Sequence, residues 1–500
     1  MFFLSRVKSN LLERKKVIRY MGNSRIINNF IWKFAEKFGA QIIAFFVSVV
    51  LARVLDPEDY GKVAIVAVFT TILAVFCDCG LGNSLIQKID ADDKDFSTVL
   101  FFNVVTSVLM CGALHIVAPY IALYYDDPEL TPLIRFLSFS LPLYGIRNVQ
   151  QAYVSKNMLF KKFFFSTVIG TIVSAVVGIG IAMRGGGPWA LVMMQLSNQV
   201  MDTIILWFTV GWKPKVYFSK KRLGRLFSYG GRILMSGVME TIYANLRALI
   251  IGKIYTQETL AFYTKGRNLP DLIGTNINNS IEIVMFPVLS KKQNNRNNLR
   301  ELTKKTIKIS TVVLFPCFMG FIGIADTLVS TVYGQKWEMA VPYMRLFCVY
   351  FMLFPFHTSN LNVIKALGRS DIILKQEVVK KIIGICLLLL TVKYGVLAMA
   401  FSLVFEGLLA QIVNTLPNRD LIKYGYRDQI LDNIPCFMVA VIMSFCVYLG
   451  GKMPVANPIK LIIQIMIGIV VYIGGIRLID RELYNYVLQF LLKIIDKGEQ

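Results

Sequence analysis

Charged residues and histidines are scarce in this chain of 500 residues. Charged residues make up 17% of the chain, compared with about 25% in an ordinary soluble domain. Hydrophobic residues make up 55%, and there are only two histidines. The apolar residues come in long blocks, and the charges gather in short stretches between those blocks. This distribution excludes a soluble globular domain.

Motifs for nucleotide, metal or nucleophile chemistry are also lacking. The run Gly185-Gly186-Gly187-Pro188 is not followed by lysine, so it predicts a turn and not a phosphate-binding loop. All eight cysteines lie within apolar segments, where a free cysteine behaves as a small hydrophobic residue. We therefore expect no disulfide framework, no metal site, no cofactor and no direct use of ATP.

The apolar blocks have the length of membrane-spanning helices. A helix needs about 20 mostly apolar residues to cross the hydrocarbon core, whereas the strands of a membrane barrel alternate in polarity. No such alternation is present. We predict an all-α, polytopic integral membrane protein with about fourteen transmembrane helices, near residues 28–51, 62–86, 97–123, 131–153, 163–183, 188–210, 224–252, 260–288, 307–330, 338–364, 371–392, 395–416, 432–450 and 458–477.

Basic residues exceed acidic ones, giving a net charge of +23. In a soluble protein this excess would indicate a nucleic-acid partner. Here the basic residues collect in alternate connections, while the other connections carry acidic runs such as residues 56–59 and 126–129. Cytoplasmic connections are rich in Lys and Arg. The pattern therefore predicts a multi-pass protein of the cell (inner) membrane with both termini in the cytoplasm, and no nucleic-acid partner.

Polar residues follow one face of the predicted span 260–288. They recur at helical spacing and comprise Thr264, Asn268, Asp271, Thr275, Asn278 and Glu282. The preceding span carries a similar face with Ser236, Glu240, Tyr243 and Arg247. Ionisable residues within spans mark a transport pathway or an internal pair. We predict a hydrated cavity shared by the two faces; the alternative is a set of interhelical hydrogen bonds and ion pairs with no substrate role.

Basic residues outnumber acidic residues within the predicted spans. This surplus of positive charge suits an anionic substrate such as a phosphate or diphosphate. The candidate residues of the substrate cavity are Arg247, Lys265, Arg267, Asp271, Asn278, Glu282, Glu240, Arg232, Arg345 and Arg147. Three ionisable residues are candidates for proton or ion coupling, namely Asp78, Glu240 and His357. No catalytic residue is expected.

Several short motifs resemble those of bacterial polysaccharide transporters, in order and in spacing. They are Leu51-Ala-Arg-Val-Leu-Asp-Pro-Glu-Asp-Tyr-Gly61, Asp78-Cys-Gly-Leu-Gly82, Tyr125-Asp-Asp-Pro128, Ile251-Gly-Lys-Ile254 with Phe262-Tyr263, Phe286-Pro-Val-Leu-Ser290 and Tyr333-Gly-Gln-Lys-Trp337. The likeness covers roughly residues 25–480. It points to the oligosaccharide (O-antigen type) flippase branch of the multidrug/oligosaccharidyl-lipid/polysaccharide exporter superfamily.

The resemblance implies two pseudo-symmetric six-helix lobes followed by two further helices. The corresponding parts are a basic cytoplasmic arm (1–27), a first lobe (28–210), a cytoplasmic linker (211–223), a second lobe (224–416), a cytoplasmic loop (417–431), the added helix pair (432–477) and a cytoplasmic tail (478–500). A faint repeat at an offset of 200 residues, which aligns Arg53 with Lys253 and Glu58 with Glu258, is typical of transporters built from two halves.

The resemblance also implies the activity. Members move undecaprenyl-diphosphate-linked oligosaccharides across the cytoplasmic membrane by alternating access, for lipopolysaccharide, capsule or exopolysaccharide synthesis. The expected partners are this lipid-linked substrate, the lipid bilayer and other membrane proteins of polysaccharide assembly, and the chain is expected to be a monomer. Two alternatives stay open: a drug or small-molecule antiporter of the same superfamily, and a membrane glycan polymerase. The short external connections disfavour the polymerase, and the surplus of cations disfavours an exporter of cationic drugs.

Overall fold

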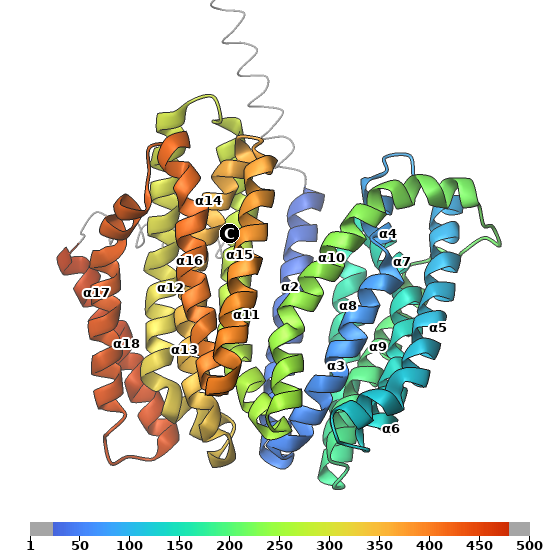
Figure 1. Ribbon diagram of the computed structural model, residues 1–500, viewed down its shortest axis with the longest axis horizontal. Coiled ribbons are helices and arrows are strands. Elements are labelled where there is room, and N and C mark those ends of the chain that lie inside the picture. The colour runs from blue at the N-terminus through green and yellow to red at the C-terminus, as the bar shows by residue number, and fades with distance from the viewer. Residues whose placement is uncertain (1–23, 480–500) are drawn as a thin grey trace, which may run out of the picture. The chain divides into compact units, whose positions relative to one another are not determined.

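The computed structural model describes residues 24–479, and all regular secondary structure in this range is helical. Most of the predicted basic arm (1–27) and cytoplasmic tail (478–500) therefore lies outside the described residues. The chain divides into two compact units, residues 1–258 and residues 259–500. Each unit is a bundle of long helices (Figure 1).

Unit 1 contains nine helices within its described residues. They are α2 (Ser24–Val54), α3 (Pro57–Asp78), α4 (Leu81–Gln87), α5 (Asp93–Tyr124), α6 (Leu130–Ser138), α7 (Ser140–Lys156), α8 (Phe160–Met183), α9 (Pro188–Thr209) and α10 (Lys220–Ile254).

Local sequence signals explain where these helices begin. The carboxylate of Asp92 accepts a hydrogen bond from the Asp95 backbone amide at 3.0 Å, and the Asp95 carboxylate accepts one from the Asp92 amide at 3.2 Å. This reciprocal capping satisfies two amides at the start of α5 that have no partner within the helix. At α9 the preceding Gly187 adopts φ +52°, and Pro188 occupies the first helical position, which suits its fixed φ.

The helices of unit 1 pack as neighbouring pairs. α8 contacts both α2 and α9, α5 contacts α6 and α7, and α10 contacts α3, α4 and α5. An apolar core at one end of the unit surrounds the buried Trp212, whose ring lies 5.9 Å from that of Tyr153 and 5.8 Å from that of Phe96. Because Trp212 belongs to the linker after α9, this core fixes the linker against α5 and α7.

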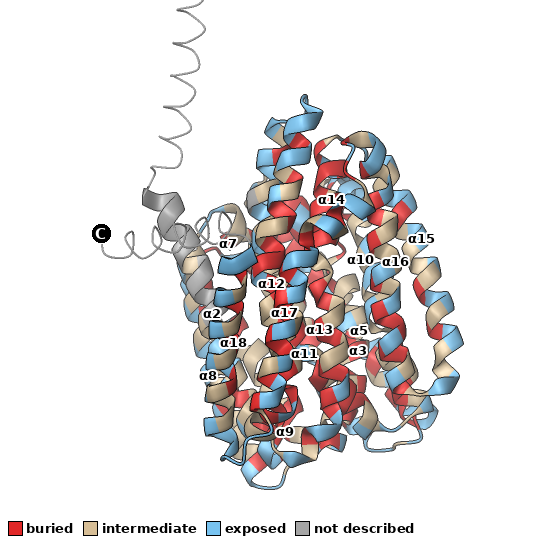
Figure 2. Cartoon of the chain, turned by 90° about the vertical axis from the view of Figure 1, so that its left-hand side faces the viewer, coloured by how far each residue is buried: buried red, intermediate tan, exposed pale blue. Residues whose placement is uncertain are grey.

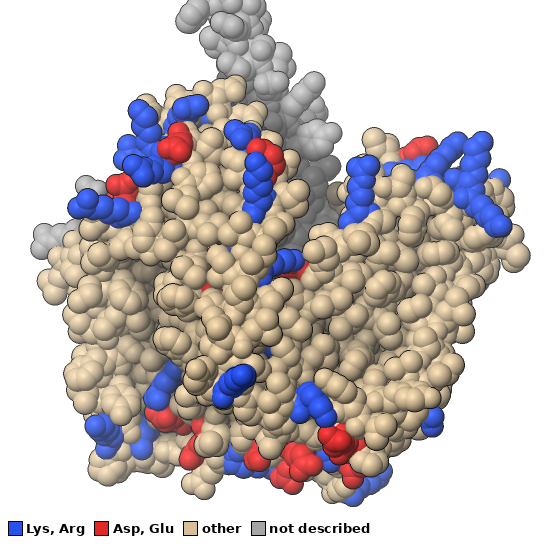
Figure 3. Space-filling view, viewed as in Figure 1, with Lys and Arg blue, Asp and Glu red and all other residues tan. Residues whose placement is uncertain are grey.

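The connections of unit 1 separate by charge. At one end, Lys156 donates to the backbone oxygen of Leu85 at 3.1 Å and Lys162 donates to that of Val210 at 3.0 Å. Figure 3 shows Lys and Arg side chains gathered over the end of the unit where α10 begins. At the other end, Lys62 pairs with Glu129 at 2.6 Å and Lys253 with Asp126 at 2.8 Å. The connections that the sequence assigned to one side thus lie at a common end; their cytoplasmic orientation stays a prediction.

Unit 2 is built around α12, and its elements are α11 (Gln257–Lys291, beginning in the last two residues of unit 1), α12 (Arg296–Val332), η1 (Gln335–Ala340), α13 (Val341–Met352), α14 (Phe354–Ala366), α15 (Ser370–Thr391), η2 (Val392–Tyr394), α16 (Val396–Leu421), α17 (Tyr426–Gly450) and α18 (Asn457–Ile479). α12 contacts α13, α14, α17 and α18. Figure 2 shows buried residues along α12, whereas α15 is largely exposed.

A buried polar network joins four helices of unit 2. The Asn360 amide donates to the Gln429 side-chain oxygen at 2.9 Å, and the Asn418 amide donates to the Asn360 side-chain oxygen at 2.7 Å. The Thr311 hydroxyl donates to the Asn433 side-chain oxygen at 2.7 Å. Because buried polar groups are costly unless they are paired, this network specifies how α12, α14, α16 and α17 meet.

The all-helical prediction is confirmed for the described residues. Among residues 24–479, nine helices or consecutive helical stretches have the length and apolar composition to cross a membrane. The count of fourteen spans stays a prediction. Three of the predicted spans are interrupted in the structure: 62–86 at Cys79–Gly80, 131–153 at Phe139 and 338–364 at Leu353.

Helix ends recur at the offset of 200 residues that was noted in the sequence. α2 ends at Val54 and α3 begins at Pro57, while α10 ends at Ile254 and α11 begins at Gln257. α10, which the resemblance places at the start of the second lobe, makes its contacts with α3, α4 and α5 in unit 1. The contacts between helices do not give the lobe boundaries, which therefore stay a prediction.

Candidate functional site

A break between α3 and α4 places Asp78 inside unit 1. Cys79 and Gly80 both adopt the left-handed conformation, with φ +51° and +67°, and end α3 directly after Asp78. The Asp78 carboxylate accepts a hydrogen bond from the Gly82 backbone amide at 2.9 Å and another from the Asn148 side-chain amide of α7. Neutral donors therefore hold this carboxylate, and its role in proton or ion coupling stays a prediction.

Gly80 also allows α10 to approach the break. A Cβ atom at this position would lie 2.4 Å from the Gly230 backbone oxygen of α10 and 2.9 Å from the Ile233 Cβ. The Ser84 hydroxyl, which already bonds within α4, lies 3.1 Å from the Leu226 backbone oxygen of α10. The short α4 is thus clamped between α7 and α10, and the position of Asp78 depends on that contact.

An ion pair crosses the interior of unit 1 close to this break. Arg147 of α7 donates from Nη1 to the Asp202 carboxylate of α9 at 2.9 Å, and the two side chains are only 15% and 9% exposed. The Arg147 guanidinium also lies over the Tyr144 ring, 5.7 Å from its centre. Its Nε is buried and has no hydrogen-bond partner among the described residues. Arg147 therefore carries a buried donor that no described residue satisfies.

The predicted site residues of α10 differ in their surroundings. Arg247 is buried, whereas Arg232 and Glu240 are exposed on the surface of the chain. All three belong to unit 1, together with Asp78 and Arg147. Five of the predicted site residues are therefore carried by the same compact unit.

The polar face predicted on α11 is present in unit 2. Arg267 pairs with Asp271 one helical turn later, with Nε 3.3 Å from the carboxylate, and both side chains are about one-third exposed, at 36% and 33%. Glu282 accepts from Lys365 of α14 at 2.7 Å, and Asn278 is buried. Both ion pairs retain accessible surface, and their place in a hydrated cavity stays a prediction.

Lys265 has different surroundings from its neighbours on α11. Its side chain is buried, and the ammonium lies 4.5 Å from the centre of the Tyr333 ring and 5.2 Å from that of Trp337. Cation–π contacts of this kind stabilise a desolvated ammonium. α11 comes close to η1 and α13 at Gly266, where a Cβ atom would lie 2.8 Å from the Ala340 backbone oxygen of η1 and 2.8 Å from the Tyr343 Cβ of α13; this contact fixes the arrangement.

The two remaining predicted residues lie elsewhere in unit 2. Arg345 of α13 pairs with Asp326 of α12 at 2.6 Å. His357 of α14 contacts the Asn414 amide of α16 through Nδ1 at 3.1 Å. Within the described residues, no group of three or more His, Cys, Asp or Glu is arranged to hold a metal ion.

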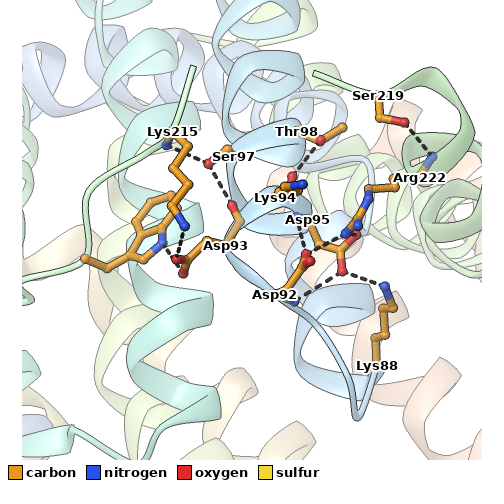
Figure 4. Close-up of polar contacts among 11 residues, drawn as sticks. Lys88, Asp92, Asp93, Lys94, Asp95, Ser97, Thr98, Lys215, Ser219 and Arg222 are labelled. Atoms are coloured by element: carbon orange, nitrogen blue, oxygen red, sulfur yellow. Dashed lines mark hydrogen bonds and ion pairs between the residues drawn. The ribbon is translucent and has the colours of Figure 1, made fainter. Parts of the chain in front are cut away.

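A second polar cluster lies at the end of unit 1 where α10 begins (Figure 4). Arg222 Nη1 lies 2.5 Å from the Asp92 carboxylate and 3.0 Å from the Asp95 carboxylate, and Lys88 also pairs with Asp95 at 2.5 Å. Burial acts to raise the pKa of Asp92, but the Asp95 amide and the Arg222 guanidinium outweigh it and hold this pKa below its ordinary value. The cluster ties α10 to the start of α5.

Comparison with known proteins identifies the class of the chain. Residues 50–342, more than half of its length, match the model of a family described as Polysaccharide biosynthesis protein. The chain belongs to this polysaccharide biosynthesis protein family. The resemblance to bacterial polysaccharide transporters that the sequence motifs suggested is confirmed.

Two curated relatives and one solved structure extend this result. Lipopolysaccharide biosynthesis protein WzxC of Escherichia coli (strain K12) is 24% identical over 76% of this chain and 78% of its own length. Succinoglycan biosynthesis transport protein ExoT of Rhizobium meliloti (strain 1021) is 21% identical over 93% and 95%. Lipid II flippase MurJ, in an inward closed conformation, has a TM-score of 0.72 with 15% identity over 91% of this chain and 99% of that structure. The chain therefore has this membrane-transporter fold.

The family match covers most of the predicted site residues. Asp78, Arg147 and the predicted residues of α10 and α11 lie within residues 50–342, whereas Arg345 and His357 lie beyond them. The predicted residues of α10 lie in unit 1, whereas those of α11 lie in unit 2. A cavity shared by these two faces stays a prediction.

The structure adds polar partners that the sequence analysis did not place in the site. They are Asn148, which holds Asp78; Asp202, which holds Arg147; Lys365, which holds Glu282; and Asp326, which holds Arg345. Asp202 was recognisable as an acid within an apolar span. Its pairing with Arg147 was not, because 55 residues separate the two along the chain.

Proposed function

We propose that this chain is a flippase for undecaprenyl-diphosphate-linked oligosaccharides, serving the synthesis of lipopolysaccharide, capsule or exopolysaccharide. The observation that carries the proposal is the family match over residues 50–342, together with the near full-length relation to a succinoglycan biosynthesis transport protein. These relatives are transport and biosynthesis proteins of surface glycans, and the chain is a multi-pass membrane transporter and not an enzyme.

The physical task defines what the chain must provide. A sugar–diphosphate headgroup cannot cross about 30 Å of hydrocarbon unaided, because desolvating its charges costs many kcal/mol. A cavity that opens to one side at a time replaces water with cations and hydrogen-bond donors, while the lipid tail stays in the bilayer. Arg147, in the interior of unit 1, and Arg267, about one-third exposed, are the cations best suited to meet the diphosphate.

Transport also requires a residue that couples it to a proton or a cation, and a defined orientation of the chain in the membrane. Asp78, whose hydrogen-bond partners within residues 24–479 are neutral donors, is the acid best suited to exchange a proton or a cation during the cycle. Both termini lie in the cytoplasm, since the basic connections of the sequence then face that side. We propose that the chain acts as a monomer.

Deletion of the gene is the direct test of this function. The deletion strain should lose one surface glycan and accumulate the corresponding lipid-linked units facing the cytoplasm. Analysis of surface polysaccharide, together with the accessibility of the lipid-linked units in membrane vesicles, measures both effects. A deletion strain with normal surface glycan contradicts the proposal, and one with normal glycan but increased drug sensitivity indicates the drug antiporter instead.

Neutralising the α11 ion pair should impair transport. Arg267→Ala and Asp271→Ala should each lower the restoration of surface glycan in the deletion strain by about tenfold, the size expected for a lost charge-assisted hydrogen bond. Lys393→Ala removes an exposed charge in η2, distant in sequence from α11, and serves as the control. Equal activity in all three variants, at matched protein levels, removes α11 from the pathway.

A further inference from the structure

A pocket lies in unit 1, at the end where α10 begins. One wall is formed by α4 and the turn that follows it (residues 84–92), and the other by the first turns of α10 (residues 222–229). The volume is about 560 Å³. Lys and Arg side chains gather over this end of the unit (Figure 3), where the sequence predicts the cytoplasmic surface of the membrane.

Arg222 is held in the pocket wall by its acidic partners. Both of its ion pairs use Nη1, and one of them ends on Asp95, whose side chain is only 1% exposed. Nε and Nη2 make no hydrogen bond to the residues that the structure describes. The Asp92–Asp95 pair therefore immobilises the guanidinium while leaving donors that the protein does not use.

Arg225 supplies a second guanidinium to the same wall. It is exposed, and its side chain forms no ion pair or hydrogen bond within residues 24–479. The neighbouring Tyr229 also lines the pocket, is 43% exposed and makes no hydrogen bond within the described range. Two arginines and a phenol thus present donors to one cavity.

The chemistry of the lining selects the kind of ligand. Guanidinium groups bind phosphate with two parallel hydrogen bonds. Asp90, on the opposite wall, offers carboxylate oxygens that accept from hydroxyl groups. Ile89, which also lines the pocket, is an apolar residue and is 97% exposed. An amphiphile with a phosphate, hydroxyl groups and a lipid chain satisfies all three features.

We propose that this pocket binds the phosphate or diphosphate group of a lipid with a hydroxylated headgroup, and that Arg225 and Arg222 are its phosphate ligands. Two lipids share this chemistry: the transported glycolipid, captured before translocation, and an anionic phospholipid of the surrounding leaflet. The first assignment rests on the proposed function; the second does not.

Binding to the purified full-length chain tests the proposal. The probes are an undecaprenyl-diphosphate-linked monosaccharide, phosphatidylglycerol and inorganic diphosphate, measured separately by native mass spectrometry in detergent. Arg225→Gln removes the phosphate ligand, and the exposed Arg225 is not part of the ion-pair cluster that orders α10. Lys221→Gln is the matched control, since it makes the same change of charge on the same helix without lining the pocket.

We expect Arg225→Gln to weaken binding of at least one lipid by about tenfold, and Lys221→Gln to leave it unchanged. A loss confined to the glycolipid identifies a substrate-capture site, and a loss confined to phosphatidylglycerol identifies a site for membrane phospholipid. An equal effect of both substitutions, no effect of either, or Arg225-dependent binding of inorganic diphosphate alone overturns the proposal. Because no transport is measured, this outcome is independent of the gene-deletion test.

Discussion

Replacing Gly80 with valine should prevent the chain from folding into a stable transporter. Gly80 adopts φ +67°, a left-handed conformation that is strained for a β-branched residue. The new Cβ would also lie 2.4 Å from the Gly230 backbone oxygen, and backbone cannot rotate away as a flexible side chain can. Backbone strain and overpacking together should destabilise unit 1 by roughly 3–5 kcal/mol. We expect little monodisperse protein on size-exclusion chromatography and no restoration of surface glycan.

The control for Gly80→Val is the same substitution at a glycine with free space. A Cβ at Gly180 in α8 would meet nothing within 4 Å, and Gly180 has an ordinary helical φ. Gly180→Val should therefore leave yield and transport close to those of the unaltered chain. If Gly80→Val is as stable and active as Gly180→Val, the close contact between α4 and α10 is not required for folding.

The break at Gly80 also shows what the sequence could and could not predict. Long apolar blocks identify membrane helices because the bilayer imposes a minimum length, and the predicted span 163–183 falls within α8 (160–183) for this reason. Averaging the hydropathy over such a block conceals a short break in the helix. The predicted span 62–86 runs through Cys79-Gly80, although glycine is common at helix ends. The structure shows that the motif Asp78–Gly82 contains this interruption, at Cys79–Gly80.

The sequence predicts the polar face of a helix better than it predicts the partners of the side chains on that face. The face of α11 could be predicted, because helical periodicity is a local property of the sequence. The partners could not: Lys365 lies 83 residues from Glu282, and Arg222 lies 130 residues from Asp92. Which acid neutralises which base is decided by tertiary packing. A list of intramembrane charges therefore overstates the number available to a substrate until the pairs are known.

Arg147 and Asp202 allow the structural and transport roles of such a pair to be separated. Arg147→Gln leaves Asp202 without its cation, and Asp202→Asn leaves Arg147 without its anion. Breaking a buried pair by removing one partner typically costs about 3–5 kcal/mol, since the remaining charge is uncompensated. Each single variant should therefore lower the thermal stability of the purified chain markedly.

The double variant Arg147→Gln/Asp202→Asn should recover most of that stability, because it leaves no unpaired charge in the interior. Transport should not recover with it. The buried Nε of Arg147 has no hydrogen-bond acceptor among the described residues. The proposed function assigns Arg147 to binding the diphosphate of the substrate. The measurement compares unfolding temperature in detergent with restoration of surface glycan for all four proteins. Wild-type transport by the double variant would make the pair purely structural, whereas a stable but inactive double variant is what a substrate-binding arginine requires.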